Sequence, residues 1–486
     1  MQPVMVSRRA FVSAAAVPAV SWAAPASAPA GKLRAGAATS NITPPLGSSL
    51  AGSMTDHIGT QVHDELHVRA LALDNGSTRL AFAVCDLCVI PREQIDRAKE
   101  LIQTHTGIPP SHVLVSAVHT HSAPPAAHLF QSKADPHYLE FLVVRIAAAV
   151  RLAVGRLEPA RIGWGLGRQD QLVFNRRYFM RPGTVPPDPF GRTTDTVLMN
   201  PGIRNPNVVK PAGPVDPDVG VLAVEALDGR PISVLGNYAL HYVGDVGGGD
   251  ISADYFASWA DAMERLAGEA GSRRYPPFVP LLTNACSGNI NNVDVLHGSA
   301  GHTPPYTHIR QVADALAAEC HRVWRGLRFS DTVPLAASVE ELELALRMPS
   351  PEDLAAARRT LSSAPATGQL RDRAQIYARE TVILAETYPN MVRTPLQALR
   401  IGDLAIGTWP GEAFVELGLE VKAKSPFRPT MLIELANDYR GYIPTVEGFQ
   451  QGGYETWRAK SSCLETQAAP RMTASLLRQL HSLAQS

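Results

Sequence analysis

The sequence predicts an α/β fold in which mixed sheets are covered by helices. Two observations lead to this class: β-branched apolar runs of strand length recur along the chain, and amphipathic segments of helical period lie between several of them. The first clear unit is strand, helix, strand, which is typical of layered α/β proteins. For 486 residues we expect one large domain or two closely joined ones.

Each predicted element rests on a local pattern. The runs at 67–74 and 79–90 flank the turn residues at 74–77, so we expect them to pair. Helical period at 92–104 and a β-branched run at 112–118 complete the first unit. The other predicted elements, in chain order, are a short strand at 36–45, a long helix at 139–157, strands at 219–227 and 231–241, helices at 253–267 and 306–327, a charged helical stretch at 351–386, and strands at 399–408 and 430–435.

The segment 181–217 is rich in Pro, Gly, Asn and Asp and shows no clear period. A loop of this length in a compact domain usually has a function. We therefore expect it to shape the entrance to a substrate pocket.

The overall composition and charge argue against a nucleic-acid partner. The chain is 45% hydrophobic and 19% charged, as soluble globular proteins are, and its formal net charge is zero. A chain without net charge has no overall field that attracts nucleic acid or an anionic membrane. We therefore expect no nucleic-acid partner.

The amino terminus carries a targeting pattern. Arg8 and Arg9 precede a short Ala/Val-rich stretch, and small residues and prolines follow to about residue 30. This order resembles a twin-arginine export signal. We expect residues 1–30 to direct export to the periplasm or out of the cell, and 31–486 to form the folded domain. No later stretch approaches the ~20 apolar residues that span a bilayer, so no transmembrane segment is expected, while peripheral contact with a membrane stays open.

Cysteine usage gives no disulfide framework. The five cysteines form an odd and widely spaced set: Cys85, Cys88, Cys286, Cys320 and Cys463. Cys85 and Cys88 have CxxC spacing, but no second CxxC supplies the other half of a zinc ribbon. Both lie in the apolar run at 80–90, so we expect buried thiols on that strand.

Histidines and one carboxylate follow predicted strands. Because side chains alternate along a strand, His119 and His121 should lie on one side, where a metal ligand and a proton-transferring group could share a pocket. His241 ends another strand, and Glu412 follows a third, in the turn Trp-Pro-Gly-Glu. Active-site groups cluster on loops at strand ends. Taken singly, His241 also fits a core histidine, and Glu412 fits an acid at a helix N-terminus.

Taken in order, these motifs resemble those of the neutral ceramidases. The shared features are a strand ending in His-Thr-His-Ser, a later Asn-x-x-x-His strand, a Pro-Gly-Glu turn and a Tyr-rich tail. In that family the matching residues bind one zinc ion, so the resemblance implies His119, His241, Glu412 and Tyr442 as Zn2+ ligands. Tyr442 begins Tyr-Ile-Pro-Thr, which is similar to the family's Tyr-Ile-Thr-Thr. The resemblance spans about 36–457 and implies a ceramidase-type catalytic domain.

The resemblance also implies residues that act beside the metal. His121 is the expected general acid and base. Tyr454 matches a second family tyrosine, and Asn175-Arg176 is similar to a substrate-contacting Asn-Arg pair. Tyr454 and Arg176 could therefore steady an oxyanion or the polar head of the substrate. Ordinary structural roles stay open for both residues: Tyr454 could be a ring at the edge of the core, and Arg176 could be a surface cation. Asp86, which precedes the first helix, is also shared.

The sequence departs from the family pattern in two places. Asn291 stands where the ceramidases have a serine, and Ser287 lies nearby without the Gly-x-Ser-x-Gly context of an α/β-hydrolase nucleophile. The chain also ends soon after the tyrosines, so no C-terminal Ig-like domain is expected. Zinc chemistry does not require the missing serine, which makes the reaction type a firmer expectation than the substrate.

The expected function is zinc-dependent hydrolysis of the amide bond of ceramide-like N-acyl lipids, which yields a fatty acid and an amine. A zinc hydrolase of another N-acyl or ester compound is the close alternative. A non-catalytic exported binding protein of the same fold is a second alternative, and the complete ligand set with His121 argues against it. A serine hydrolase based on Ser287 is the third, and it lacks a nucleophile elbow.

Overall fold

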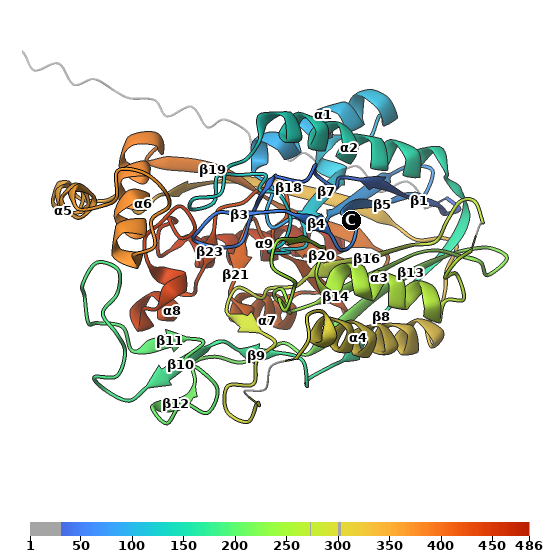
Figure 1. The fold of residues 1–486 in the computed structure, drawn as a ribbon. Helices are drawn as coiled ribbons and strands as arrows, with labels where there is room; N and C mark the ends of the chain where they lie inside the picture. The colour runs from blue at the N-terminus through green and yellow to red at the C-terminus, as the bar shows by residue number, and fades with distance from the viewer. Residues whose placement is uncertain (1–30, 273, 300–302, 486) are drawn as a thin grey trace, which may run out of the picture.

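An eight-stranded and a four-stranded sheet form the centre of this computed structural model, which describes residues 31–272, 274–299 and 303–485 (Figure 1). The predicted export signal at 1–30 lies outside the described residues. The larger sheet has the strand order β16-β14-β13-β8-β1-β5-β6-β7, and the smaller has the order β18-β19-β20-β22. Their bounds are β1 (Arg34–Asn41), β5 (His67–Asp74), β6 (Arg79–Cys85), β7 (Val113–Ala117), β8 (Glu158–Arg168), β13 (Asp218–Ala226), β14 (Pro231–Tyr238), β16 (Val279–Asn284), β18 (Leu335–Ala345), β19 (Met391–Ile401), β20 (Leu404–Thr408) and β22 (Thr430–Ile433).

Short strands pair outside the two main sheets. The segments β10 (Arg177–Met180), β11 (Val197–Met199) and β12 (Val208–Pro211) form a three-stranded sheet. The two-stranded pairs are β2 (Ser49–Leu50) with β3 (His57–Ile58), β4 (Gln61–Val62) with β15 (Asp250–Ile251), β9 (Phe174–Asn175) with β17 (Ile290–Asn291), and β21 (Glu412–Ala413) with β23 (Tyr442–Ile443).

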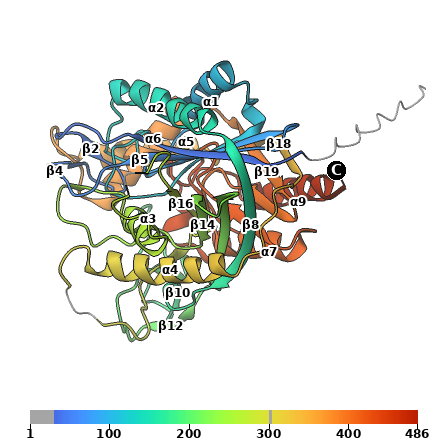
Figure 2. The ribbon, with the colours of Figure 1, turned by 90° about the vertical axis from the view of Figure 1, so that its right-hand side faces the viewer.

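Helices cover both sheets, as the amphipathic segments predict. Helix α2, with α1 beside it, packs against β1, β5 and β6, whereas α3 and α4 pack against β8, β13 and β16, and α9 packs against β18 to β20. Figure 2 shows β8 curving from one half of the larger sheet to the other. The helices are α1 (Arg92–Thr106), η1 (Pro110–His112), α2 (Pro136–Gly155), α3 (Tyr255–Leu266), α4 (Thr307–Arg325), α5 (Pro351–Ser362), α6 (Arg373–Thr387), α7 (Val415–Lys424), α8 (Val446–Gln451), η2 (Tyr454–Thr456) and α9 (Ala468–Gln485).

Parallel strand pairs are embedded in otherwise antiparallel sheets. The pairs β6–β7, β14–β16 and β20–β22 are parallel, whereas neighbours such as β1–β5, β13–β14 and β18–β19 are antiparallel. A parallel pair needs a crossover connection, and here α1, α3 and α7 lie in the three crossovers. The predicted α/β class, with mixed sheets covered by helices, is therefore confirmed.

Several predicted boundaries are wrong. The strand predicted at 79–90 ends at Cys85, because the Leu87 N–H bonds the Cys85 carbonyl at 2.7 Å and turns the chain. The strand predicted at 231–241 ends at Tyr238, so His241 lies on the following loop. The strand predicted at 399–408 is the end of β19 and all of β20, joined by a turn at Gly402 with φ +60°.

Longer predicted segments also differ. The segment 181–217 is not a pure loop, since β11 and β12 within it pair with β10. The charged stretch at 351–386 is two helices, and the second begins where the Asp372 carboxylate accepts from the Gln375 N–H at 2.9 Å. Strands β8 and β18 and helix α9 are not among the predicted elements.

A buried lysine links α1 to the chain that follows β22. Lys99 is 7% exposed and donates to the Asn437 side-chain oxygen at 2.8 Å. The same oxygen accepts from the Val115 N–H of β7 at 3.2 Å. Three segments are thus joined at one amide, next to the region that carries Glu434 and Tyr439.

The Lys99 ammonium should make stability rise with pH. Burial lowers the pKa of Lys99 to about 8, whereas in the unfolded chain it is ~10.4. Between these values the unfolded state binds more protons, so the free energy of unfolding increases as the pH rises. Between pH 7.5 and 10, we expect the free energy of unfolding of the wild type to increase by roughly 1–3 kcal/mol relative to that of Lys99→Met. Urea unfolding of both proteins measures this gain, and a difference that does not change with pH would contradict the assignment.

Candidate metal centre

The carboxyl ends of the three parallel strand pairs meet at one place. The loops after these strands carry Cys88 (β6), His119 (β7), His241 (β14), Ser287 (β16), Glu412 (β20) and Glu434 (β22). Buried hydrogen bonds hold the strand ends together: the Asn284 amide donates to the Val118 carbonyl at 3.0 Å, and the Asn284 carbonyl accepts from the Glu434 N–H at 3.0 Å. Side chains far apart in the sequence therefore face a common centre.

His119, His241 and Glu412 form a buried cluster of potential metal ligands. The Glu412 Oε2 atom lies 3.3 Å from His119 Nε2 and 3.6 Å from His241 Nε2. All three residues are at most 3% exposed. His241 Nε2 and Glu412 Oε2 have no hydrogen-bond partner among the described residues, and buried polar atoms without partners are rare in folded proteins.

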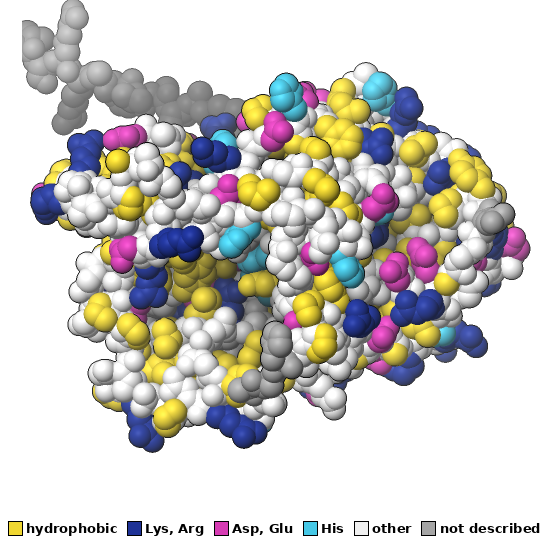
Figure 3. Space-filling view, in the orientation of Figure 1, with side chains coloured by type: hydrophobic (Ala, Val, Ile, Leu, Met, Phe, Trp, Pro, Cys, Tyr) yellow, Lys and Arg dark blue, Asp and Glu magenta, His cyan; other side chains and the backbone are white. Residues whose placement is uncertain are grey.

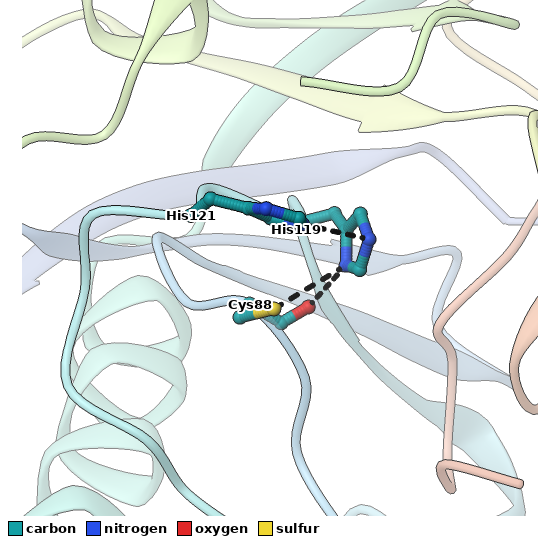
Figure 4. Close-up of side chains that lie close together, drawn as sticks. All are labelled: Cys88, His119 and His121. Carbon is teal, nitrogen blue, oxygen red and sulfur yellow. Dashed lines mark hydrogen bonds between the residues drawn. The ribbon is translucent and has the colours of Figure 1, made fainter. Parts of the chain in front are cut away.

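Backbone carbonyls orient the two imidazoles. His119 Nδ1 lies 2.9 Å from the Cys88 carbonyl oxygen (Figure 4), and His241 Nδ1 lies 3.2 Å from the Ser287 carbonyl oxygen. An Nδ1–H that donates to a carbonyl leaves Nε2 with its lone pair free, which is the usual arrangement behind a metal-binding histidine. Both Nε2 atoms point toward Glu412.

The spacing of these donors fits a divalent metal ion. Ligand atoms ~2.1 Å from a tetrahedral zinc ion lie about 3.4 Å from one another, and the measured separations from Glu412 Oε2 are 3.3 and 3.6 Å. Imidazole nitrogen and carboxylate oxygen are ligands that zinc accepts. The three residues stand after predicted strands, and the resemblance to the neutral ceramidases implies them as ligands. They thus come together in a suitable arrangement.

The predicted fourth ligand lies next to Glu412. Strands β21 and β23 run parallel with Glu412 opposite Tyr442. Burial would raise the pKa of Glu412, but His119, Arg176 and the Tyr442 hydroxyl outweigh it and lower that pKa. Glu412 is therefore the ionised member of the cluster.

A further tyrosine, Tyr439, holds the other oxygen of Glu412 and was not predicted. Its hydroxyl donates to Glu412 Oε1 at 2.9 Å, which leaves Oε2 to face the histidines. Burial raises the pKa of Tyr439 and keeps the phenol protonated as a donor. Tyr439 stands only three residues before Tyr442 in the same tyrosine-rich segment, but no spacing rule distinguishes their roles.

The backbone of the His-Thr-His motif differs from the extended strand that the sequence predicts. Strand β7 ends at Ala117, and His119 has φ +72°, a conformation uncommon for residues other than glycine. The two rings still converge, with His121 Nε2 3.3 Å from His119 Nε2 (Figure 4). The left-handed backbone at His119 brings them together, not the alternation of a strand. The pKa of His121 is lowered, chiefly by burial.

Two neighbours fix the position of His121. Its ring stacks on Tyr242 with a centroid distance of 3.6 Å. On the other side lies Gly52, which has φ +105°, and a Cβ at this position would lie 2.3 Å from His121 Cγ. Only glycine satisfies both the backbone and the contact.

Cys88 is not on the strand where the sequence placed it. Cys85 ends β6 and is buried as expected, whereas Cys88 lies on the following loop, lines the cavity beside the candidate ligands and has its Sγ 3.6 Å from His119 Nδ1 (Figure 4). The turn at Leu87 is responsible for this difference.

Tyr454 and Arg176 occupy different positions. Tyr454 lines the cavity, and its ring is 5.7 Å from that of Tyr442. The guanidinium of Arg176 lies 5.4 Å from the centre of the Tyr442 ring, and its Nε donates to Glu455 at 2.9 Å. Arg176 is 5% exposed, so the surface role is wrong, and its Nη2 has no partner among the described residues.

Ser287 and Asn291 take part in structural hydrogen bonds. The Ser287 hydroxyl donates to Glu434, a carboxylate whose pKa burial raises to about 8 and which also accepts from the Ala413 N–H at 2.9 Å. Asn291 donates to Asn200 at 2.6 Å. A serine whose hydroxyl faces a carboxylate instead of a histidine does not form the pair that serine hydrolysis needs.

A cavity of about 230 Å³ opens beside the cluster, with His119, His121 and Glu412 in its wall. Figure 3 shows that this face of the molecule is hollowed and that hydrophobic side chains line the hollow. Beside the donors, the cavity wall contains tyrosine hydroxyls and apolar side chains. A small organic group can therefore be held next to the predicted ligands.

Comparison with known proteins supports the fold. No protein-family model and no curated protein matches the chain. The solved structure of the neutral ceramidase from Pseudomonas aeruginosa matches with a TM-score of 0.70 at 18% identity, over 93% of this chain and 75% of that one. A structure of a ceramidase complexed with C2 matches with a TM-score of 0.69 at 18% identity, with the same coverage. The expected ceramidase-type fold is confirmed.

Removing the Tyr439 hydroxyl should weaken metal binding. Tyr439→Phe leaves Glu412 Oε1 without its donor and frees the carboxylate to rotate. Loss of a partner behind a metal ligand typically costs 10–100-fold in affinity, and we expect a loss of this size for Zn2+ in competition with a chromogenic chelator. Tyr275→Phe, at a ring that is 74% exposed, is the control. An unchanged affinity in Tyr439→Phe would show that the hydroxyl does not position Glu412.

None of the helices in the described ranges is long and apolar enough to cross a membrane.

Proposed function

We propose that the protein is a zinc-dependent hydrolase that cleaves the amide bond of ceramide-like N-acyl lipids. The observation that carries this proposal is the buried cluster of His119, His241 and Glu412 beside a cavity, in which His241 Nε2 and Glu412 Oε2 have no hydrogen-bond partner among the described residues. The fold shared with ceramidases supports the same reaction class. The products would be a fatty acid and an amine.

His119, His241, Glu412 and Tyr442 would hold the zinc ion. When bound, zinc supplies Lewis acidity, which polarises a substrate carbonyl and makes water a nucleophile near neutral pH. Glu412 contributes the negative charge of the ligand set, and Tyr439 keeps its second oxygen turned away from the metal. Two neutral imidazoles and one carboxylate are typical of catalytic zinc sites.

His121 is the proposed proton carrier. Its ring is fixed between Tyr242 and Gly52, and its Nε2 lies beside the ligand His119. A base in this position can take a proton from the attacking water and deliver it to the leaving nitrogen. The water then adds its hydroxyl to the acyl carbon, the C–N bond breaks, and the amine leaves with the proton.

Tyr454 and Arg176 are proposed to stabilise negative charge during the reaction. Tyr454 lines the cavity, and burial raises its pKa, so its hydroxyl stays a hydrogen-bond donor. Arg176 acts from behind Tyr442, held by Glu455. Donors and charges that are fixed before the reaction are the usual means of stabilising an oxyanion.

Ceramide is the first substrate to test, and another N-acyl or ester compound is the alternative. Asn291, at the position of the family serine, donates to Asn200. This difference favours testing a broad substrate panel. A non-catalytic binding protein would have no need of His121 held so closely beside the ligands.

Export is part of the proposal. Arg8 and Arg9 begin the twin-arginine-type pattern within 1–30, so the enzyme would act in the periplasm or outside the cell. Peripheral contact with a membrane would bring it to lipid substrates.

Metal dependence tests the proposed function directly. Purified protein loaded with one Zn2+ per chain should hydrolyse ceramide or another N-acyl compound, lose activity with a chelator, and regain it when zinc is restored. His119→Ala should lose both zinc and activity, whereas His105→Ala, at an exposed histidine of α1, should lose neither. Zinc content by mass spectrometry and product release by chromatography are the measurements. Hydrolysis that is unaffected by the chelator would refute the zinc reaction, and a zinc-loaded protein without hydrolysis would favour a binding protein.

The role of His121 and its contact with Gly52 can be tested separately from metal binding. His121→Ala should keep zinc and lose about 10²–10⁴-fold in kcat, the usual contribution of an acid–base group. Gly52→Ala should lower kcat in the same direction, because the added Cβ would lie 2.3 Å from His121 Cγ. Gly47→Ala is a matched control, since Gly47 also has positive φ (+91°) but has nothing within 4 Å of an added Cβ. Undiminished kcat in His121→Ala would remove this residue from the mechanism.

A further inference from the structure

We infer that Phe130 and Met54 limit the acyl group to short chains, with Phe130 as the residue that determines specificity. This inference deepens the proposed function and rests on it for the identity of the scissile bond.

The cavity beside the metal ligands is small. Its volume of about 230 Å³ equals that of roughly eight water-sized groups at ~30 Å³ each. Pockets that enclose most of a drug-sized ligand are usually ~300–1,000 Å³. An amide and an acyl group of about six carbons would fill the available space.

The walls of the cavity differ in character. Met54 and Phe130 form an apolar part of the wall and belong to one hydrophobic cluster with Tyr377 and Trp457. The lining also includes Ser53 and Ser461. An acyl chain gains free energy by burial against the apolar wall, and a polar amine portion does not. The acyl group is therefore assigned to the side of Phe130.

The backbone around Phe130 is fixed. Phe130 has φ +44°, and its carbonyl accepts from the Arg379 guanidinium of α6 at 2.8 Å. The neighbouring Gln131 amide donates to the Met54 carbonyl at 2.9 Å and to the Leu370 carbonyl at 2.8 Å. The Leu370 N–H donates back to the Gln131 side-chain oxygen at 2.8 Å. Through Gln131, these bonds connect the backbone of Phe130 to Met54 and to the chain before α6.

An aromatic cluster behind Phe130 prevents its ring from moving outward. The ring of Tyr377, which is 1% exposed, lies 6.1 Å from that of Phe130. Phe190 and Trp457 pack on Tyr377 at 5.9 and 5.7 Å. Close-packed side chains yield little space without cost. The side chain of Phe130 is thus backed by rings, and a longer chain cannot displace it easily.

Chain-length profiles test this inference. The substrates are amides of one chromogenic amine with acyl groups from acetyl to dodecanoyl, assayed below their critical micelle concentrations with zinc-loaded protein. In the wild type, kcat/KM should rise to about six carbons and then fall at least tenfold by dodecanoyl. In Phe130→Ala the maximum should move to longer chains, with at least a tenfold gain for dodecanoyl, because one extra methylene in a fixed pocket is worth about 10–200-fold. Phe141→Ala, at a ring that is 40% exposed on α2, is the matched control and should keep the wild-type profile.

Binding of the product carboxylates gives a measurement that does not depend on turnover. Calorimetry with acetate to dodecanoate on zinc-loaded protein should show affinity rising about fourfold per buried methylene and levelling off near six carbons in the wild type but not in Phe130→Ala. Met54→Ala should extend the range in the same way if Phe130→Ala unfolds. Affinity that continues to rise to dodecanoate in the wild type, or a wild-type profile retained in both the Phe130→Ala and the Met54→Ala variants, would overturn the inference. Absence of zinc-dependent hydrolysis together with this binding profile would refute the proposed function alone.

Discussion

A buried carboxylate beside two imidazoles is the constraint on which the centre of this protein depends. Glu412 is 2% exposed, and its Oε2 faces the rings of His119 and His241. Placing an ionised group there costs several kcal/mol unless positive charge and hydrogen bonds compensate. Tyr439 supplies a hydrogen bond to one oxygen, and Gly288 allows the loop after β16 to pack directly against the Glu412 backbone, where an added Cβ would lie 2.3 Å from its carbonyl oxygen. A bound cation would complete the compensation.

The three parallel strand pairs explain how the ligands reach that carboxylate. Parallel strands present their carboxyl ends at the same edge, and each of the three pairs is joined by a crossover that contains a helix. The helices are held on the outer faces of the sheets, so the loops that carry His119, His241 and Glu412 are free to meet. Antiparallel strands separate the pairs β14–β16 and β6–β7 within the larger sheet, whereas β20–β22 lies in the smaller sheet.

The sequence predicted what depends on local patterns. The unit β6, α1, β7 was found because its apolar residues follow clear periods. His119, His241 and Glu412 stand after predicted strands, but the resemblance to the neutral ceramidases was needed to select them as candidate ligands. The fold of β10 to β12 could not be predicted, since short strands without a periodic run form there by pairing with one another. The roles of Gly52 and Tyr439 were also missed, because each is defined by contact with a residue on a distant segment.

Because the three strand pairs meet at the candidate metal centre, a bound ligand would also affect how long the folded chain persists. The donor atoms come together only when segments from β7 to β23 are all in place, and loop-closure entropy makes such long-range contacts late events in folding. A ligand that binds only the assembled centre stabilises the whole domain, by ~4 kcal/mol at a thousand times its Kd. Proteases act on opened chains, so under the proposed function the supply of metal would set how long each molecule survives.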